Sequence, residues 1–118
     1  MLLTMLKCKL HNAVVTEANI EYEGSVAIDA DLMKEAGFLA GEQVEIYNIT
    51  NGERFTTYVI KGEGGSKTIG IQGAAAHKAS KGDRVIICAY AQMDENAAKQ
   101  HRAVALMMDE NNNIKVRK

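Results

Sequence analysis

The feature that most constrains how this 118-residue chain can fold is an internal repeat. Gly-Glu-Gln-Val at residues 41–44 is echoed by Gly-Asp-Arg-Val at residues 82–85. Each copy follows a predicted strand and a short alanine-containing helical segment, and each leads into another predicted strand. A Gly-acid pair can turn the chain tightly while its carboxylate accepts backbone N–H bonds. Although Gly-Asp turns are common before strands, the matching context favours a duplicated, β-rich architecture.

The rest of the chain predicts short strands punctuated by glycine, since there are 10 glycines and no proline. Alternating polarity predicts a first strand at residues 2–10 with Leu6, Cys8 and Leu10 on the buried face. Residues 16–19 are typical of a turn or a single helical turn. A helix is expected after Asp29 or Asp31 as N-cap, with Gly37 ending it, and a second helix at residues 94–102. Further strands are expected at residues 26–28, 44–49, 54–60, 68–72, 84–91, 104–108 and 114–116.

These elements predict a mainly β fold with a few short helices. Two interleaved ββαβ halves of this kind look like a double-psi β-barrel, a closed architecture with few free edges. The length fits one domain spanning residues 1–118.

The composition narrows the classes of partner and compartment. The formal net charge is −1, from 14 Lys and Arg against 15 Asp and Glu, which argues against a general nucleic-acid or membrane-surface binder. No apolar run approaches the ~20 residues needed to span a bilayer. The two cysteines, Cys8 and Cys88, and the lack of a recognisable leader favour a cytoplasmic protein with reduced thiols.

The sequence offers one unusual candidate for chemistry, the Gly24–Ser25 pair. A glycine admits strained backbone conformations that can bring the serine Oγ onto the preceding carbonyl, although most Gly-Ser pairs are simply turns. The three histidines are too widely spaced to suggest a metal site, and no phosphate-binding loop is present.

Four motifs give this pair a context: Lys-Cys-Lys-Leu-His at residues 7–11, Tyr-Glu-Gly-Ser at 22–25, Asn-Ile-Thr-Asn-Gly-Glu-Arg-Phe-Thr-Thr-Tyr at 48–58, and Gly-Ala-Ala-Ala-His at 73–77. In this order they resemble the pyruvoyl-dependent aspartate 1-decarboxylases, over residues 1 to about 92. The resemblance implies a double-psi β-barrel that converts L-aspartate to β-alanine and CO₂ for pantothenate biosynthesis. It also implies a homotetramer with sites between subunits, and an accessory maturation factor in some members.

The same resemblance implies a covalent pyruvoyl cofactor made from Ser25, without a metal or pyridoxal phosphate. Self-cleavage after Gly24 would leave a β chain, residues 1–24, and an α chain, residues 25–118. The pyruvoyl group at Ser25 would form a Schiff base with the substrate, and Tyr58 would return the proton, since a phenol is protonated at neutral pH. The implied substrate-binding residues are Lys9, Arg54, Thr57, Gly73, Ala74 and Ala75, and the implied processing or supporting residues are His11, Tyr22 and Gln72.

Two positions depart from the family pattern. Gln72 stands where asparagine is usual, so the amide is kept with a reach about one methylene longer. Tyr47 stands where tryptophan is frequent, which suggests a change in packing. Strand alternation further predicts that Arg54 and Tyr58 share one face while Thr57 lies on the other.

Two other functions compete with the aspartate decarboxylase hypothesis. A double-psi barrel can serve as a non-catalytic binding module, because fold alone does not set function. The pyruvoyl chemistry could also act on another amino acid, such as glutamate. From the residues alone, Arg54 and Tyr58 would read as an ordinary exposed cross-strand pattern.

Overall fold

A computed structural model describes residues 1–118. The strands are β1 (Leu2–Val14), β2 (Glu17–Asn19), β3 (Ser25–Asp29), β4 (Gln43–Asn48), β5 (Arg54–Gly62), β6 (Ile69–Gln72), β7 (Arg84–Asp94), β8 (Val104–Met108) and β9 (Ile114–Arg117). The helices are α1 (Ala30–Ala36), the 3₁₀ helix η1 (Gly73–His77) and α2 (Glu95–Gln100). None of the helices has the length and apolar character needed to cross a lipid bilayer.

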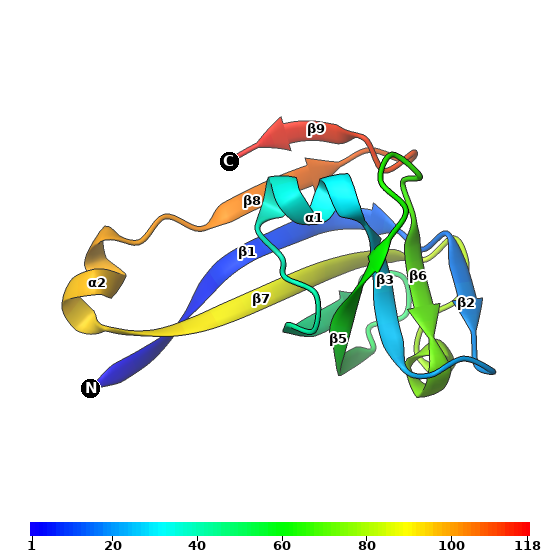
Figure 1. The fold of residues 1–118 in the computed structure, drawn as a ribbon, viewed down its shortest axis with the longest axis horizontal. Coiled ribbons are helices and arrows are strands. Elements are labelled where there is room, and N and C mark those ends of the chain that lie inside the picture. The colour runs from blue at the N-terminus through cyan, green and yellow to red at the C-terminus, as the bar shows by residue number, and fades with distance from the viewer.

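All nine strands join in one mixed sheet with the order β2-β6-β3-β5-β4-β7-β1-β8-β9. Because β1 leads almost directly into β2, the same stretch of chain pairs with β7 on one side and with β6 on the other. The sheet therefore curls around its core, and the prediction of a mainly β, barrel-like fold is confirmed. Figure 1 shows β1 and β7 continuing beyond the barrel as a long two-stranded arm that ends at α2.

The repeated turns occupy equivalent places in this barrel. Gly41 has a φ of 83° and Gly82 a φ of 93°, so both need the left-handed conformation that glycine adopts without strain. The Gly41 N–H donates to the Val59 carbonyl at 2.7 Å, and the Gly82 N–H donates to the Val15 carbonyl at 2.8 Å. The first bond ties its turn to β5, and the second ties its turn to the link between β1 and β2.

The acidic residues of the two turns also match. Glu42 Oε1 accepts from the Leu39 N–H at 3.0 Å, and Asp83 Oδ2 accepts from the Ser80 N–H at 2.9 Å. Each carboxylate therefore closes a four-residue turn, at residues 39–42 and 80–83, by accepting a backbone N–H bond as the repeat predicts. The first unit runs β3–α1–β4 and the second runs β6–η1–β7, and β3 pairs antiparallel with β6 between them. The strand that pairs parallel with β6 comes from the N-terminus, as β2.

The core is a cluster of 21 buried residues contributed by both units. Cys8 and Leu10 point into it, as the alternation of β1 predicts. In α1, Leu32, Met33 and Ala36 form the buried stripe that faces the barrel.

Helix α1 begins and ends where the sequence predicts. The Asp29 side chain accepts from the Asp31 N–H at 2.7 Å as N-cap, and Gly37 has a φ of 100° at the C-cap. Residues 16–19, in contrast, were expected to turn but include β2, which pairs with β6. The strand there depends on a partner 53 residues away, since the Thr16 hydroxyl donates to the Ile69 carbonyl. The second helix is also shorter than expected, because α2 ends at Gln100.

Candidate active site

Ser25 is the first residue of β3 and is only 2% exposed. It lies opposite Gln72 in the β3–β6 register. Its Oγ donates to Gln72 Oε1 at 3.3 Å and has the Glu23 carbonyl as an alternative acceptor at 3.4 Å. Both distances are long for a hydroxyl donor, so the hydroxyl is oriented without being held tightly.

Gly73 brings the main chain of η1 against the segment that precedes Ser25. A Cβ added at Gly73 would lie 2.4 Å from both N and Cα of Gly24 and 2.8 Å from the Tyr22 carbonyl oxygen. Gly73 also has a φ of 69°. A Cβ added at Gly24 would meet nothing closer than 3.8 Å. The sequence suggested that Gly24 needs a conformation only glycine adopts freely. The structure instead places that requirement at Gly73, which has a positive φ and packs against Gly24.

A cavity of about 360 Å³ opens beside Gly24. Its walls come from β5 and from η1 with the residue that follows it. The lining residues are Gly24, Phe55, Thr56, Thr57, Tyr58, Ala74, Ala75 and Lys78. The structure thus brings five of the residues implied by the resemblance together, namely Gly24, Thr57, Tyr58, Ala74 and Ala75.

Tyr58 and Thr57 line this cavity together although they alternate along β5. Tyr58 is 42% exposed and pairs with Gln43, whereas Thr57 is half-buried and pairs with the buried Val44. The two side chains therefore alternate as predicted, and both residues still contribute to the wall of the cavity.

Lys9 and Arg54 are not among the residues that line the cavity. Lys9 lies on β1 opposite Cys88 of β7, and β5, β4 and β7 separate β1 from the Ser25 strand β3 in the sheet. Arg54 begins β5, pairs with Tyr47 and is exposed. Lys9 is partly exposed and alternates with the buried Cys8 and Leu10, so its side chain lies on the side of β1 away from the core.

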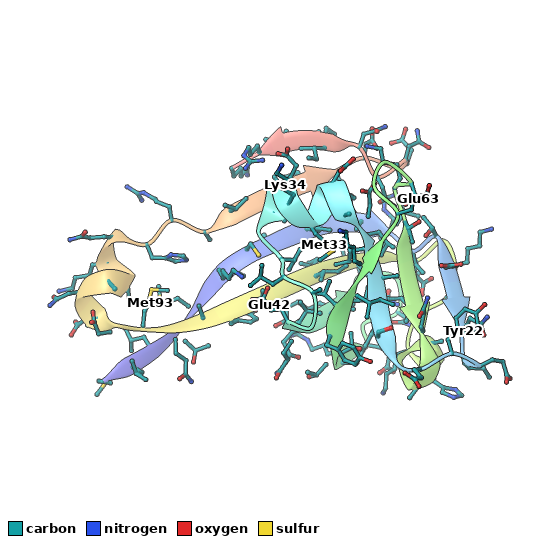
Figure 2. All side chains as sticks on the ribbon, in the orientation of Figure 1. Tyr22, Met33, Lys34, Glu42, Glu63 and Met93 are labelled. Atoms are coloured by element: carbon teal, nitrogen blue, oxygen red, sulfur yellow. The ribbon has the colours of Figure 1, made fainter.

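Of the three implied processing or supporting residues, His11 and Tyr22 are not among those that line the cavity. Burial lowers the pKa of the His11 imidazole, and the charges of Lys9 and Lys118 lower it further. The Tyr22 side chain is 57% exposed and projects from the segment that follows β2, as Figure 2 shows. Only the main chain of Tyr22 approaches Gly73.

Lys78 is a cavity residue that the sequence motifs did not single out. It is the only charged side chain in the lining, and its Nζ contacts Glu53 Oε2 at 2.9 Å. Its carbonyl accepts from the Nδ2 atoms of Asn48 at 3.1 Å and Asn51 at 3.0 Å, so its main chain is fixed. The available signal was its position directly after the Gly-Ala-Ala-Ala-His motif. Phe55 and Thr56 also line the cavity. Both lie inside the motif at residues 48–58, but the resemblance implied no role for either.

No group of three or more His, Cys, Asp or Glu side chains gathers as a potential metal site. Cys8 and Cys88 are both free and buried. Burial raises the pKa of the Cys8 thiol to about 11, and burial also raises that of Cys88. A raised pKa keeps both thiols protonated at neutral pH, so neither is activated as a nucleophile.

Comparison with known proteins identifies the family of this chain. The profile of the aspartate decarboxylase family matches residues 1–115. The chain is 58% identical to the aspartate 1-decarboxylase of Thioalkalivibrio sulfidiphilus over 97% of its own length and 90% of that protein. It is 59% identical to that of Alcanivorax borkumensis over 95% and 89% of the two chains, and 53% identical to that of Caulobacter vibrioides over 98% of both. This chain belongs to the aspartate decarboxylase family.

Proposed function

We propose that this chain is an aspartate 1-decarboxylase that converts L-aspartate to β-alanine and CO₂, the β-alanine step of pantothenate biosynthesis, with a pyruvoyl group made from its own Ser25. The observation that carries the proposal is the buried Ser25 hydroxyl beside a Gly24 that is pressed against Gly73 and opens onto a cavity.

Processing would begin when Ser25 Oγ attacks the Gly24 carbonyl carbon. The C–N bond breaks as the ester forms, and the freed amine takes a proton. Loss of the Cα proton then expels the Gly24 carboxylate from the β carbon, and water replaces the nitrogen, which leaves as ammonia. Gln72 would support the first step by orienting the hydroxyl, because its Oε1 accepts a hydrogen bond from Ser25 Oγ at 3.3 Å. The products would be chains 1–24 and 25–118.

The residues around position 25 fit a pyruvoyl group. The site is nearly closed to solvent at Ser25, and glycine and alanine residues leave room beside it. A ketone conjugated to an amide supplies the electron sink that decarboxylation of an amino acid requires. Tyr58, whose ring lines the cavity, would hold the proton that must return to the substrate carbon.

Substrate binding would use groups from more than one chain. Thr57 offers a hydroxyl inside the cavity, and backbone N–H groups of residues 73–75 can approach an anion closely because their side chains are small. Arg54 and Lys9 lie outside the cavity and would have to come from a neighbouring subunit. We therefore propose a homotetramer with sites between subunits, in which Arg54 holds a substrate carboxylate in two parallel bonds.

Two further parts of the proposal concern the cellular setting. A cytoplasmic location agrees with two free, buried thiols that form no disulfide. An accessory maturation factor is a proposed partner for the cleavage step, because the long contacts of the Ser25 hydroxyl leave it only loosely oriented.

Intact-mass measurement on the purified chain tests the proposal. We expect two fragments that separate after Gly24, a larger fragment that gains mass with borohydride, and CO₂ release from L-aspartate. Ser25→Ala should give a folded, uncut and inactive chain. An uncut wild-type chain that still releases CO₂ would overturn the pyruvoyl mechanism. A chain that stays uncut and inactive even with a maturation factor would instead favour a binding module.

A panel of amino acids tests the substrate. CO₂ release should be fastest with aspartate, slower with glutamate and absent with asparagine, since a dicarboxylate is needed for a carboxylate clamp at Arg54. Faster release from glutamate than from aspartate would keep the chemistry and change the substrate.

A further inference from the structure

The Arg54 guanidinium lies over an aromatic ring. Its Cζ is 4.5 Å from the centroid of the Tyr47 ring, across the β4–β5 pairing. A guanidinium stacked in this way interacts through its face, so its N–H groups, which lie in its plane, stay free for a carboxylate. Arg54 forms no salt bridge within the chain.

A nearby carboxylate does not compete for this cation. Glu45 is on the same side of β4 as Tyr47, two residues earlier. Both of its carboxylate oxygens accept from the Thr56 hydroxyl, at 2.9 and 2.8 Å. No carboxylate of the chain therefore pairs with the Arg54 guanidinium, while the ring restricts its position.

The Tyr47 ring is itself held at its outer end. Its hydroxyl lies 2.9 Å from the hydroxyl of Tyr90, which comes from β7 on the other side of β4. The backbone of β4 fixes the inner end of the Tyr47 side chain, so a hydrogen bond at the outer end limits rotation of the ring plane. The hydrogen bond to Tyr47, followed by burial, raises the pKa of Tyr90, so the Tyr90 hydroxyl stays protonated near neutral pH.

We propose that Tyr47 and Tyr90 form a positioning pair for substrate binding, in which the bond between their hydroxyls fixes the Tyr47 ring as a platform for the Arg54 guanidinium. The inference rests on the proposed function, in which Arg54 holds a substrate carboxylate. Arginine loses much rotamer freedom when it binds, and restricting it beforehand lowers that cost. The pair explains why tyrosine can replace tryptophan at position 47: the ring is smaller, but its hydroxyl has a partner.

Tyr90→Phe tests the pair in the processed enzyme, because it removes one hydroxyl and keeps the ring. We expect KM for aspartate to rise about two- to tenfold, the worth of one surface hydrogen bond, with kcat within about twofold of wild type. Tyr47→Phe should give the same change, and the double variant should be no worse than either single variant. The extent of cleavage should stay at the wild-type value, and the urea midpoint should fall only slightly, as expected for the loss of one exposed hydrogen bond.

Tyr47→Trp provides a second test, in which the ring at position 47 is exchanged rather than only stripped of its hydroxyl. It keeps a platform for Arg54 but removes the partner of the Tyr90 hydroxyl, so adding Tyr90→Phe to Tyr47→Trp should have little further effect on KM. Unchanged KM in Tyr90→Phe, or kcat falling in step with a rise in KM, would overturn the pair while leaving the decarboxylase proposal intact. A wild-type enzyme that releases no CO₂ from aspartate would instead overturn the proposed function itself.

Discussion

The contact between Gly73 and Gly24 makes the cleavage site sensitive to a single methyl group. Gly73→Ala adds a Cβ 2.4 Å from Gly24 and makes an alanine adopt a φ of 69°, in the left-handed region that favours glycine. We expect slower cleavage and a loss of stability of roughly 2–5 kcal/mol, from overpacking and backbone strain together. Gly52→Ala is the matched control, since Gly52 has a φ of 79° but open space around its Cβ position. Intact mass over time and urea unfolding measure the two effects, and equal behaviour of the variants would contradict the steric explanation.

Lys78 gives the cavity its only formal charge, and we predict that it attracts the substrate rather than reacting with it. Lys78→Gln should raise KM for aspartate by about fivefold or less, with little change in kcat, because exposed charges act weakly. Glu53→Gln should act in the opposite direction, since it releases Lys78 from its 2.9 Å ion pair. The salt dependence of kcat/KM should weaken in Lys78→Gln. A lower KM in that variant would show that the charge does not help binding.

At the scale of elements, Asp29 connects α1 with the loop before β6. Its Oδ1 accepts from the N–H groups of Asp31 at 2.7 Å and Gly65 at 3.0 Å, and its Oδ2 accepts from that of Lys67 at 2.8 Å. Burial raises the pKa of this carboxyl, but the backbone donors together lower the pKa by more than burial raises it. The pKa in the folded chain therefore lies below its ordinary value. The carboxylate therefore contributes stability above about pH 3.9, and this contribution is lost as the pH falls through the folded pKa.

Asp29→Asn tests this connection because an amide nitrogen would face the Lys67 N–H, and two donors would meet. We expect a loss of about 1–3 kcal/mol at neutral pH that narrows as the pH falls below about 3.9. Asp31→Asn, at an exposed position in the same helical turn, should cost less than about 1 kcal/mol. Denaturant unfolding across pH measures both, and a constant difference between Asp29→Asn and wild type would contradict the linkage.

Elements with local signals could be predicted from the sequence, and those that depend on distant partners could not. Helix α1 was predictable because Asp29 and Gly37 mark its ends within the segment itself. Strand β2 was not, because Glu17–Asn19 is too short to carry an alternating pattern and becomes a strand only by pairing with residues 70–72. The site divides in the same way. The motifs indicated Ser25 and Tyr58, but the bond between Tyr47 and Tyr90 joins residues 43 positions apart that carry no shared motif.

At the scale of the whole molecule, one chain supplies only part of the proposed binding site. The cavity holds Thr57 and Tyr58, whereas Arg54 and Lys9 lie outside it. Co-expressing Arg54→Ala with Tyr58→Phe should therefore restore part of the activity that each variant lacks, since some mixed sites would combine two intact halves. Light scattering should show a tetramer in every preparation. Mixed assemblies with no more activity than either variant alone would indicate that Arg54 and Tyr58 act within one subunit.

The N-terminal segment has an unusual place in this barrel, because β1 pairs with β7 and β8 while β2 pairs with β6. If the chain is cut after Gly24, these strands belong to a separate peptide that is interwoven with the larger one. The peptide could leave only if the barrel opened. A denatured sample would then have to recombine two molecules, so its recovery would depend on concentration, whereas the uncut precursor would refold as one.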